Sequence, residues 1–315
     1  MTAFFIGDVA LDEYYSADHW LGPAEKGFVK ELPAECGGSI ANAAVVHAGL
    51  GGATEFISLL NHSPLSDRLV AELNANGVST RHMLRDPAIP DSRNLIFLVG
   101  GEHVVLTVEM GQQPMWLPAD ALAALRSPGF LYTTLYRARR LHARTPAGVL
   151  AQADLLADLR AHGRRVIFDL DVGGATGADL PYLRGAGVVL FNRIGFRATF
   201  GHDDLAQVAD WMRQNRIGRV VRTTSEDGAE ALDGDRLVRV PGYRVAVADV
   251  TGAGDTLGAS LTWGLGRGDS FDEALAFAVG AASRSVTRHG PRGGKALPEE
   301  VQDWITRQRG GPTLG

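Results

Sequence analysis

The sequence has little cysteine and no long apolar run. Cys36 is the only cysteine among 315 residues, which excludes an internal disulfide framework and is typical of a reducing compartment. No apolar stretch approaches the roughly 20 residues that a membrane-spanning helix needs. Residues 1–13 lack a basic region ahead of their short apolar run, so they do not resemble a signal peptide. These absences predict a soluble, cytoplasmic protein with no membrane partner.

The sequence also lacks a basic surface and an internal linker. The formal net charge is -5, and basic residues are mixed with acidic ones rather than gathered in a stripe. A nucleic-acid partner is therefore not expected. Length alone allows one large domain or two small ones, but no Pro/Ser-rich stretch or charged run divides the chain. We expect a single domain over 1–315 that binds a small molecule.

The chain does contain a regular alternation of short apolar runs and segments with helical period. Five runs predict strands: 3–9, 54–60, 130–136, 165–170 and 219–224. Their continuous apolarity is typical of parallel strands that are covered on both faces. Strands that alternate with helices predict a layered α/β fold, whose ligands bind at the carboxyl ends of the strands.

Two of the intervening helices have recognisable start and stop signals in the sequence. Thr145 and Pro146 predict a helix start, and Gly163 predicts its end. Ser270 and Glu273 have the spacing of a capping box, ahead of a helix that runs to Gly290.

Two segments at about 13–35 and 91–111 interrupt the alternation. The first is aromatic and rich in turns, and the second contains two strands joined around Gly100 and Gly101. Together they predict a small sheet that projects from the core. It could close over a pocket, pair subunits, or be a simple hairpin, and the residues leave these alternatives open. Residues 309–315 predict a frayed tail.

Residues 249–260, DVTGAGDTLGAS, combine a flexible turn, backbone amides and a carboxylate at a predicted helix start. The unpaired N–H groups from Gly252 to Asp255 and the helix dipole predict a phosphate or oxyanion site. The same donors are expected to lower the pKa of Asp255 and make it a weak base. Phosphoryl transfer tolerates such a base, because the acceptor hydroxyl loses its proton late. The alternative is an aspartate that only caps the helix.

Near the other end of the chain, residues 36–52, CGGSIANAAVVHAGLGG, place Gly37 and Gly38 directly before a predicted helix. Glycines at such a place let a ligand touch the backbone, and Asn42 could present its amide to hydroxyl groups. Asp8 lies at the end of the first predicted strand and Asp12 follows it, where a carboxylate could accept hydrogen bonds from a polyol.

Taken together and in this order, these segments resemble the ribokinase-like carbohydrate kinases of the PfkB family. DVTGAGDTLGAS is similar to the C-terminal signature of that family and GGSIANAAVVHAGLGG to the N-terminal one. The resemblance runs over essentially the whole chain. It implies a three-layer α/β/α core with a mainly parallel central sheet and a small β-lid. It also implies a kinase that uses ATP and Mg²⁺ to phosphorylate a hydroxyl of a sugar or sugar-like molecule.

The resemblance also implies roles for individual residues. Asp255 takes the position of the catalytic base, and the amides of Gly252, Ala253 and Gly254 take that of the anion hole. The sugar-binding positions fall on Asp12, Gly38, Ser39 and Asn42. The nucleotide-binding positions fall on Asn192, Thr223, Ser225 and Gly228. Asp249, helped by carbonyls of 288–294, falls near where some members bind a monovalent cation such as K⁺. The lid pairs subunits in many members, so a homodimer is one implied assembly.

The chain departs from the family pattern on the nucleotide side. Asn192 is kept, but Gly195 stands where members usually carry the Glu that organises the magnesium and phosphate waters. Ser225 replaces the first Gly of the segment that contacts the nucleotide phosphates. Asp171 stands where sugar kinases often have Asn, and it could bind the magnesium waters in place of the absent Glu. The Mg²⁺ ligands are therefore unassigned.

Two other functions stay open, and the departures motivate the first of them. One is a non-catalytic or weakly active regulatory protein of the same fold that binds a sugar or nucleotide. The other is a nucleoside kinase, in which aromatic residues such as Tyr14, Tyr15 and Trp20 stack on a base. Four arginines beyond a predicted strand suggest an acidic or phosphorylated sugar, against the alternative of a solvated basic loop: Arg137, Arg139, Arg140 and Arg144.

Overall fold

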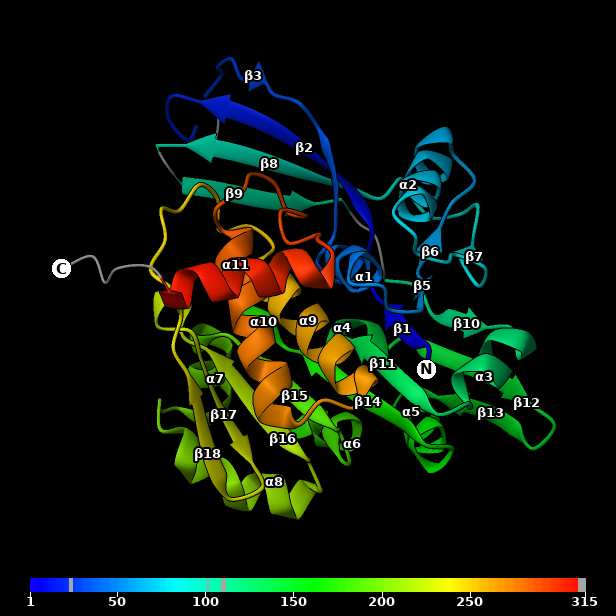
Figure 1. Cartoon of the computed structure of the whole chain (residues 1–315). Coiled ribbons are helices and arrows are strands. Elements are labelled where there is room, and N and C mark those ends of the chain that lie inside the picture. Colours follow the sequence, from blue (N-terminus) through cyan, green and yellow to red (C-terminus); the bar gives the residue numbers. More distant parts are fainter. Residues whose placement is uncertain (23–24, 101, 109–111, 311–315) are drawn as a thin grey trace.

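The centre of the molecule is an eight-stranded sheet, seen in a computed structural model that describes residues 1–22, 25–100, 102–108 and 112–310 (Figure 1). The strand order is β18-β17-β16-β15-β14-β11-β1-β5. Six strands run parallel: β1 (Ala3–Ile6), β5 (Thr54–Ile57), β11 (Gly129–Thr133), β14 (Arg164–Asp169), β15 (Val188–Phe191) and β16 (Arg219–Thr223). Two antiparallel strands extend one edge: β17 (Ala229–Asp233) and β18 (Arg236–Val240). The predicted mainly parallel sheet is confirmed.

Helices cover both faces of this sheet. One face carries α1 (Ser39–Gly49), α2 (Pro64–Ala75), α9 (Ala253–Arg267), α10 (Phe271–Ser285) and α11 (Pro298–Gly310). The other carries α3 (Ala119–Leu125), α4 (Leu135–Ala138), α5 (Gln152–Ala161), α6 (Leu180–Leu183), α7 (Arg193–Phe200) and α8 (Ala209–Asn215). Successive side chains of a strand point to opposite faces, so in β1 Phe5 joins the first apolar core while Phe4 and Ile6 join the second. The result is the expected three-layer α/β/α arrangement.

A second sheet stands apart from the core, above α11 in Figure 1. We call it the outer sheet. It consists of β2 (Ala10–Ala17), β3 (Lys30–Glu31), β4 (Glu35–Gly37), β8 (Arg93–Val99) and β9 (Glu102–Thr107). Strands β2 and β8 pair in parallel from Leu11 opposite Arg93 to Ala17 opposite Val99. The two segments that break the alternation of the sequence therefore meet in one sheet, with 23–24, 101 and 109–111 outside the described residues.

Several predicted boundaries need correction. The helix expected from Thr145 begins at Gln152, because Thr145 ends strand β12 (Leu141–Thr145). This strand forms a hairpin with β13 (Gly148–Ala151) and also pairs with β10 (Met115–Leu117). The apolar run 54–60 divides into β5 and β6 (Leu59–Leu60), and β6 pairs with β7 (Leu84–Arg85). Hairpin pairing overrode the local helix-start signal of Thr145 and Pro146.

The C-terminal helices agree more closely with the sequence. Ser270 and Glu273 form the predicted capping box, in which the Ser270 N–H donates to Glu273 Oε2 at 3.0 Å and the Glu273 N–H to Ser270 Oγ at 3.3 Å. Helix α10 ends at Ser285, before Gly290. Arg309 belongs to α11 rather than to a tail, and 311–315 lie outside the described residues. Within the described part of the chain, no helix has the length and apolarity to cross a membrane.

Candidate active site

Helix α9 begins where the sequence predicts, after the glycine turn of 249–260. The Thr256 N–H makes the first intrahelical bond, to the Gly252 carbonyl at 2.8 Å. The turn also contains a bond from the Ala253 N–H to the Val250 carbonyl, at 3.2 Å. Of the three amides expected to form the anion hole, that of Ala253 is therefore already engaged in the turn. The amides of Gly252 and Gly254 belong to the same helix N-terminus, whose free N–H groups and dipole favour an anion.

The side chain of Asp255 joins the two ends of the sequence. Its Oδ1 accepts a hydrogen bond from Ser39 Oγ at 2.6 Å, and its Oδ2 accepts one from Asn42 Nδ2 at 3.0 Å. Ser39 and Asn42 lie one turn apart on α1, so they present both donors to the same carboxylate. Gly38 precedes this helix with a φ of 99°, and a Cβ there would overlap the carbonyl oxygen of Asp8. Only glycine suits that position without strain.

The electrostatics of Asp255 differ from the sequence expectation. Burial raises the pKa of Asp255 to about 7, and the charges of Asp169 and Asp171 act in the same direction, while the hydrogen bonds from Ser39 and Asn42 lower it. The prediction of a lowered pKa is therefore wrong. It considered the helix N-terminus alone, whereas desolvation by the surrounding fold dominates. A carboxylate that titrates near neutral pH is a stronger general base than an ordinary aspartate.

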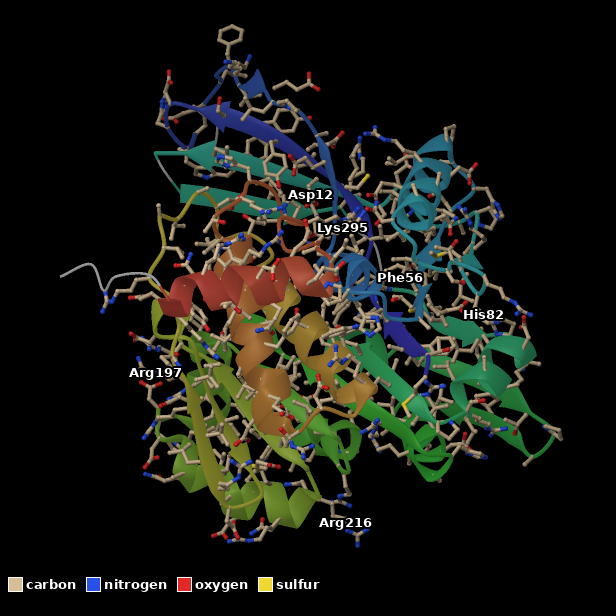
Figure 2. All side chains as sticks on the ribbon, viewed as in Figure 1. Asp12, Phe56, His82, Arg197, Arg216 and Lys295 are labelled. Carbon is tan, nitrogen blue, oxygen red and sulfur yellow. The ribbon has the colours of Figure 1, made fainter. Side chains whose placement is uncertain are left out.

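Asp12 lies on β2, near the point where this strand leaves the core for the outer sheet (Figure 2). It is 7 % exposed, and burial raises its pKa. Asn94 Nδ2, on the neighbouring strand β8, donates to Asp12 Oδ1 at 2.7 Å. Gly37 packs so closely against the Asp12 carboxylate that a Cβ there would overlap it. Asn94 had no recognisable signal in the sequence, because only the pairing of β2 with β8 brings it to Asp12.

Arg292 is a second residue that the sequence did not single out. Its Nε donates to Asn42 Oδ1 at 3.2 Å, and its guanidinium pairs with Glu72. Since the Asn42 oxygen faces Arg292, the Asn42 amide nitrogen is directed to Asp255. Arg292 also lines an open cavity of about 510 Å³, together with Cys36 and Lys295. The loop 288–294 thus reaches the group of residues around Asn42 and Asp255.

Asn192 caps helix α7, which follows β15. Its Oδ1 accepts from the Gly195 N–H at 2.7 Å, and its Nδ2 donates to Asp171 Oδ1 at 2.7 Å. Asp169, at the end of β14, accepts a hydrogen bond from the Tyr132 hydroxyl at 2.7 Å, and burial raises the pKa of Asp169 to about 6. The loop after β14 therefore brings acidic side chains close to Asn192 and within electrostatic reach of Asp255.

The segment after β16 keeps the backbone of a glycine turn without its first glycine. Ser225 has a φ of 57°, in the left-handed region, and Gly228 has a φ of 97°. The Thr224 N–H donates to the Gly228 carbonyl at 2.9 Å and closes the turn directly after Thr223. A serine in this conformation carries a strain energy of about 1 kcal/mol. Ser225 thus adopts a backbone conformation that glycine would adopt without strain.

Asp249 connects the start of the 249–260 segment to the loop at Gly290. Its Oδ1 accepts from the Thr251 N–H and its Oδ2 from the Gly290 N–H, both at 2.9 Å. Although burial acts to raise it, these hydrogen bonds hold the pKa of Asp249 below its usual value. Among the described residues, no group of three or more His, Cys, Asp or Glu side chains is arranged to hold a metal ion. A monovalent cation beside Asp249 stays a prediction.

Comparison with known proteins places this geometry in a family. The model of the pfkB family carbohydrate kinases matches residues 4–298. The chain belongs to that family. It is 28 % identical over 306 residues to the bifunctional protein HldE of Bradyrhizobium sp., and 28 % identical over 305 residues to that of Chromohalobacter salexigens. These alignments cover 92 % and 90 % of this chain but 60 % of each relative, so the chain spans about 60 % of their length.

Solved structures show the same fold. Ribokinase of Arabidopsis thaliana, complexed with ribose and ATP, superposes with a TM-score of 0.81 at 21 % identity, covering 96 % of this chain and 98 % of that one. Ribokinase of Thermotoga maritima superposes with a TM-score of 0.79 at 20 % identity, and the match covers 97 % of this chain and 99 % of the ribokinase. Adenosine kinase of Sinorhizobium meliloti superposes with a TM-score of 0.74 at 20 % identity, and the match covers 96 % of this chain and 98 % of the adenosine kinase. At these identities the likeness concerns the fold alone.

The four arginines that follow β11 each contact a carboxylate or an aromatic ring of this PfkB family member. Each has a protein partner: Arg137 pairs with Asp8, Arg139 pairs with Asp179, Arg140 lies 3.9 Å from the Tyr136 ring centroid, and Arg144 lies 4.6 Å from that of Trp116. The cluster is therefore neither an open anion site nor a fully solvated loop. The hypothesis of an acidic acceptor loses the observation on which it rested.

Arg137 offers a test of this structural role. We expect Arg137→Met to lower the free energy of unfolding by about 2 kcal/mol, because it leaves the Asp8 carboxylate without its cation. Arg137 is 1 % exposed, whereas the Asp8 side chain is 31 % exposed, so solvent replaces the lost ion pair only in part. Urea denaturation measures the effect, and Arg144→Met, at an exposed position, is the control with an expected change within about 0.5 kcal/mol. Equal stabilities for the two variants would contradict the prediction.

Proposed function

We propose that this PfkB kinase transfers the γ-phosphoryl group of ATP to a hydroxyl of a sugar or sugar-like molecule. The observation that carries the proposal is the Asp255 carboxylate, held by Ser39 and Asn42 beside the N-terminus of α9. A base and an anion-binding turn on adjacent residues are what attack of a hydroxyl on a phosphoryl group requires. Asp255 accepts the hydroxyl proton, while the amides of Gly252 and Gly254 receive the charge of the transferred group.

The acceptor is proposed to bind between α1 and the outer sheet. Asp12 and Asn42 supply polar groups from the two sides, and Asn94 fixes the Asp12 carboxylate by its hydrogen bond. Gly38 and Ser39 line the path from these groups to Asp255. The outer sheet acts as a lid that excludes water when the acceptor is bound.

The nucleotide is proposed to bind on the side of α7 and the turn after β16. Asn192, Thr223, Ser225 and Gly228 contact its phosphates. The Arabidopsis ribokinase of the same fold is described with ATP, which supports ATP as the donor. Bound Mg²⁺ would neutralise phosphate charge, and it takes oxygen ligands from carboxylates and phosphates. The carboxylate of Asp171 beside Asn192 fits such a group.

The test is ADP formation by the purified chain with Mg-ATP and a panel of acceptors. The panel contains neutral sugars, sugar acids, sugar phosphates and nucleosides. We expect ADP release with at least one carbohydrate. Sugar binding measured by calorimetry without ADP above background for any acceptor would instead identify a binding or regulatory protein. Of the three aromatic residues considered for stacking on a base, Tyr15 and Trp20 each pack against Phe97 with ring centroids 5.5 Å apart. Tyr14 is within electrostatic reach of Asp12 and Asp249, so the nucleosides in the panel test its role.

The raised pKa of Asp255 predicts the pH dependence of this reaction. With a pKa of about 7 in the free enzyme, the ionised form that accepts the proton decreases below neutral pH. We therefore expect kcat/KM to fall about tenfold per pH unit below pH 7 and to level off above it. The profile is measured at saturating Mg²⁺ between pH 5 and 9. A rate that is unchanged down to pH 5 would show that Asp255 titrates as an ordinary carboxyl.

A further inference from the structure

Position 195, where family members usually carry a Glu, has no room for a side chain in this protein. Gly195 is buried in the first turn of α7, and a Cβ built on it would overlap the carbonyl oxygen of Asp171 and lie 3.3 Å from the Gly174 nitrogen. No side chain of any kind fits at 195 while the loop after β14 keeps its place. The missing carboxylate is thus part of a local packing arrangement rather than an isolated substitution.

Hydrogen bonds fix the loop after β14 against α7. Thr199 Oγ1 donates to the Gly195 carbonyl at 2.8 Å and accepts from the Ala175 N–H at 2.8 Å. Asn192 Nδ2 donates to Asp171 Oδ1 at 2.7 Å. The loop is therefore held at both ends of the short helix η1 (Asp171–Gly173).

The packing of the loop against Gly195 and the hydrogen bond from Asn192 fix the position of Asp171. Its φ is 41°, in the left-handed region that Asn and Asp tolerate better than most residues. The side chain is exposed, and its charge acts on both Asp169 and Asp255. Asp171 is therefore an accessible carboxylate, hydrogen-bonded to Asn192 and close enough to influence the base.

We propose that Asp171 supplies, from the loop after β14, the carboxylate that most PfkB kinases carry three residues after Asn192. This inference rests on the proposed kinase function. Mg²⁺ in nucleotide sites is held by one or two carboxylates together with substrate phosphates and water. Asp171 fits that chemistry, because Asn192 engages one of its oxygens and its side chain is exposed. It acts as a positioning residue for the metal–nucleotide complex, and Gly195 is the residue that makes room for its loop.

Nucleotide binding with and without metal tests the assignment directly. Asp171→Asn removes the charge but keeps the size of the side chain, the tolerance for a positive φ and an oxygen that accepts from Asn192. Calorimetry measures ADP affinity with and without Mg²⁺, and electron paramagnetic resonance measures Mn²⁺ binding in the presence of ADP. We expect the metal-dependent gain in ADP affinity to fall by about 10-fold to 100-fold in Asp171→Asn. Affinity for metal-free ADP should stay within about threefold of wild type.

Asp210→Asn is the matched control, since it removes the same charge from an exposed aspartate on α8 that pairs with Arg213. It should bind metal and ADP like wild type. An Asp171→Asn variant with wild-type metal-dependent affinity would overturn the assignment while leaving the kinase function intact. A wild-type protein that binds no ADP with or without Mg²⁺ would overturn the kinase function, and the role of Asp171 with it.

Discussion

Replacing Asp255 by asparagine is expected to lower kcat about 10³-fold while ligand affinities stay within about threefold of wild type. Asparagine has the same size and can still bond to Ser39 or Asn42, but it cannot accept the proton of the acceptor hydroxyl. Rapid-quench measurement of ADP formation gives the rate, and calorimetry gives the affinities. A variant within tenfold of the wild-type rate would exclude Asp255 as the base.

The same variant should be more stable than wild type at alkaline pH. The pKa of Asp255 in the folded protein is about 7, above its ordinary value, so the protonated form suits the fold better than the ionised form. The contribution of this carboxyl to stability is therefore full below about pH 4 and is lost as the pH rises through 7. Thermal unfolding at pH 8 should show a higher Tm for Asp255→Asn, with a much smaller difference at pH 4. Asp235→Asn, at an exposed ion pair with Arg213, controls for the loss of one charge.

Restoring the family glutamate at position 195 is expected to harm the protein rather than improve it. In Gly195→Glu, the new Cβ meets the Asp171 carbonyl, which is backbone and cannot rotate away. Overpacking of this kind costs about 1–3 kcal/mol of stability. Displacement of the loop should also lower kcat/KM about 100-fold, because a shift of about 1 Å at a reacting group has an effect of that size.

Gly177→Glu is the control for this experiment. It introduces the same side chain near the same loop, but a Cβ at Gly177 has open space around it. Its Tm and kcat/KM should resemble those of wild type. A Gly195→Glu variant that is as stable as wild type and faster would show that Gly195 marks a weakened enzyme rather than an adapted one.

The local sequence was enough to predict the elements whose ends depend on neighbouring residues. Ser270 and Glu273 cap α10 because their side chains reach backbone groups three residues away. The start of α9 is also local, but it depends on backbone conformation: Gly252 precedes the helix with a φ of 76°, which glycine adopts without strain. Thr145 and Pro146 carried an equally clear helix signal, but pairing of β12 with β13 outweighed it. Such pairing depends on distant chain segments, so the short-range pattern could not reveal it.

The two signatures and the alternation of apolar runs determined, by themselves, the layered α/β fold, the carbohydrate-kinase family and the position of the candidate base. Tertiary structure alone decided the properties of that carboxyl group. Burial raises the pKa of Asp255, and Asn94 and Arg292 reach the site only through strand pairing and a distant loop. The meaning of Gly195 also emerged only from packing against Asp171. Desolvation and steric fit are properties of segments brought together in space, whereas capping and turn formation are properties of neighbours in the chain.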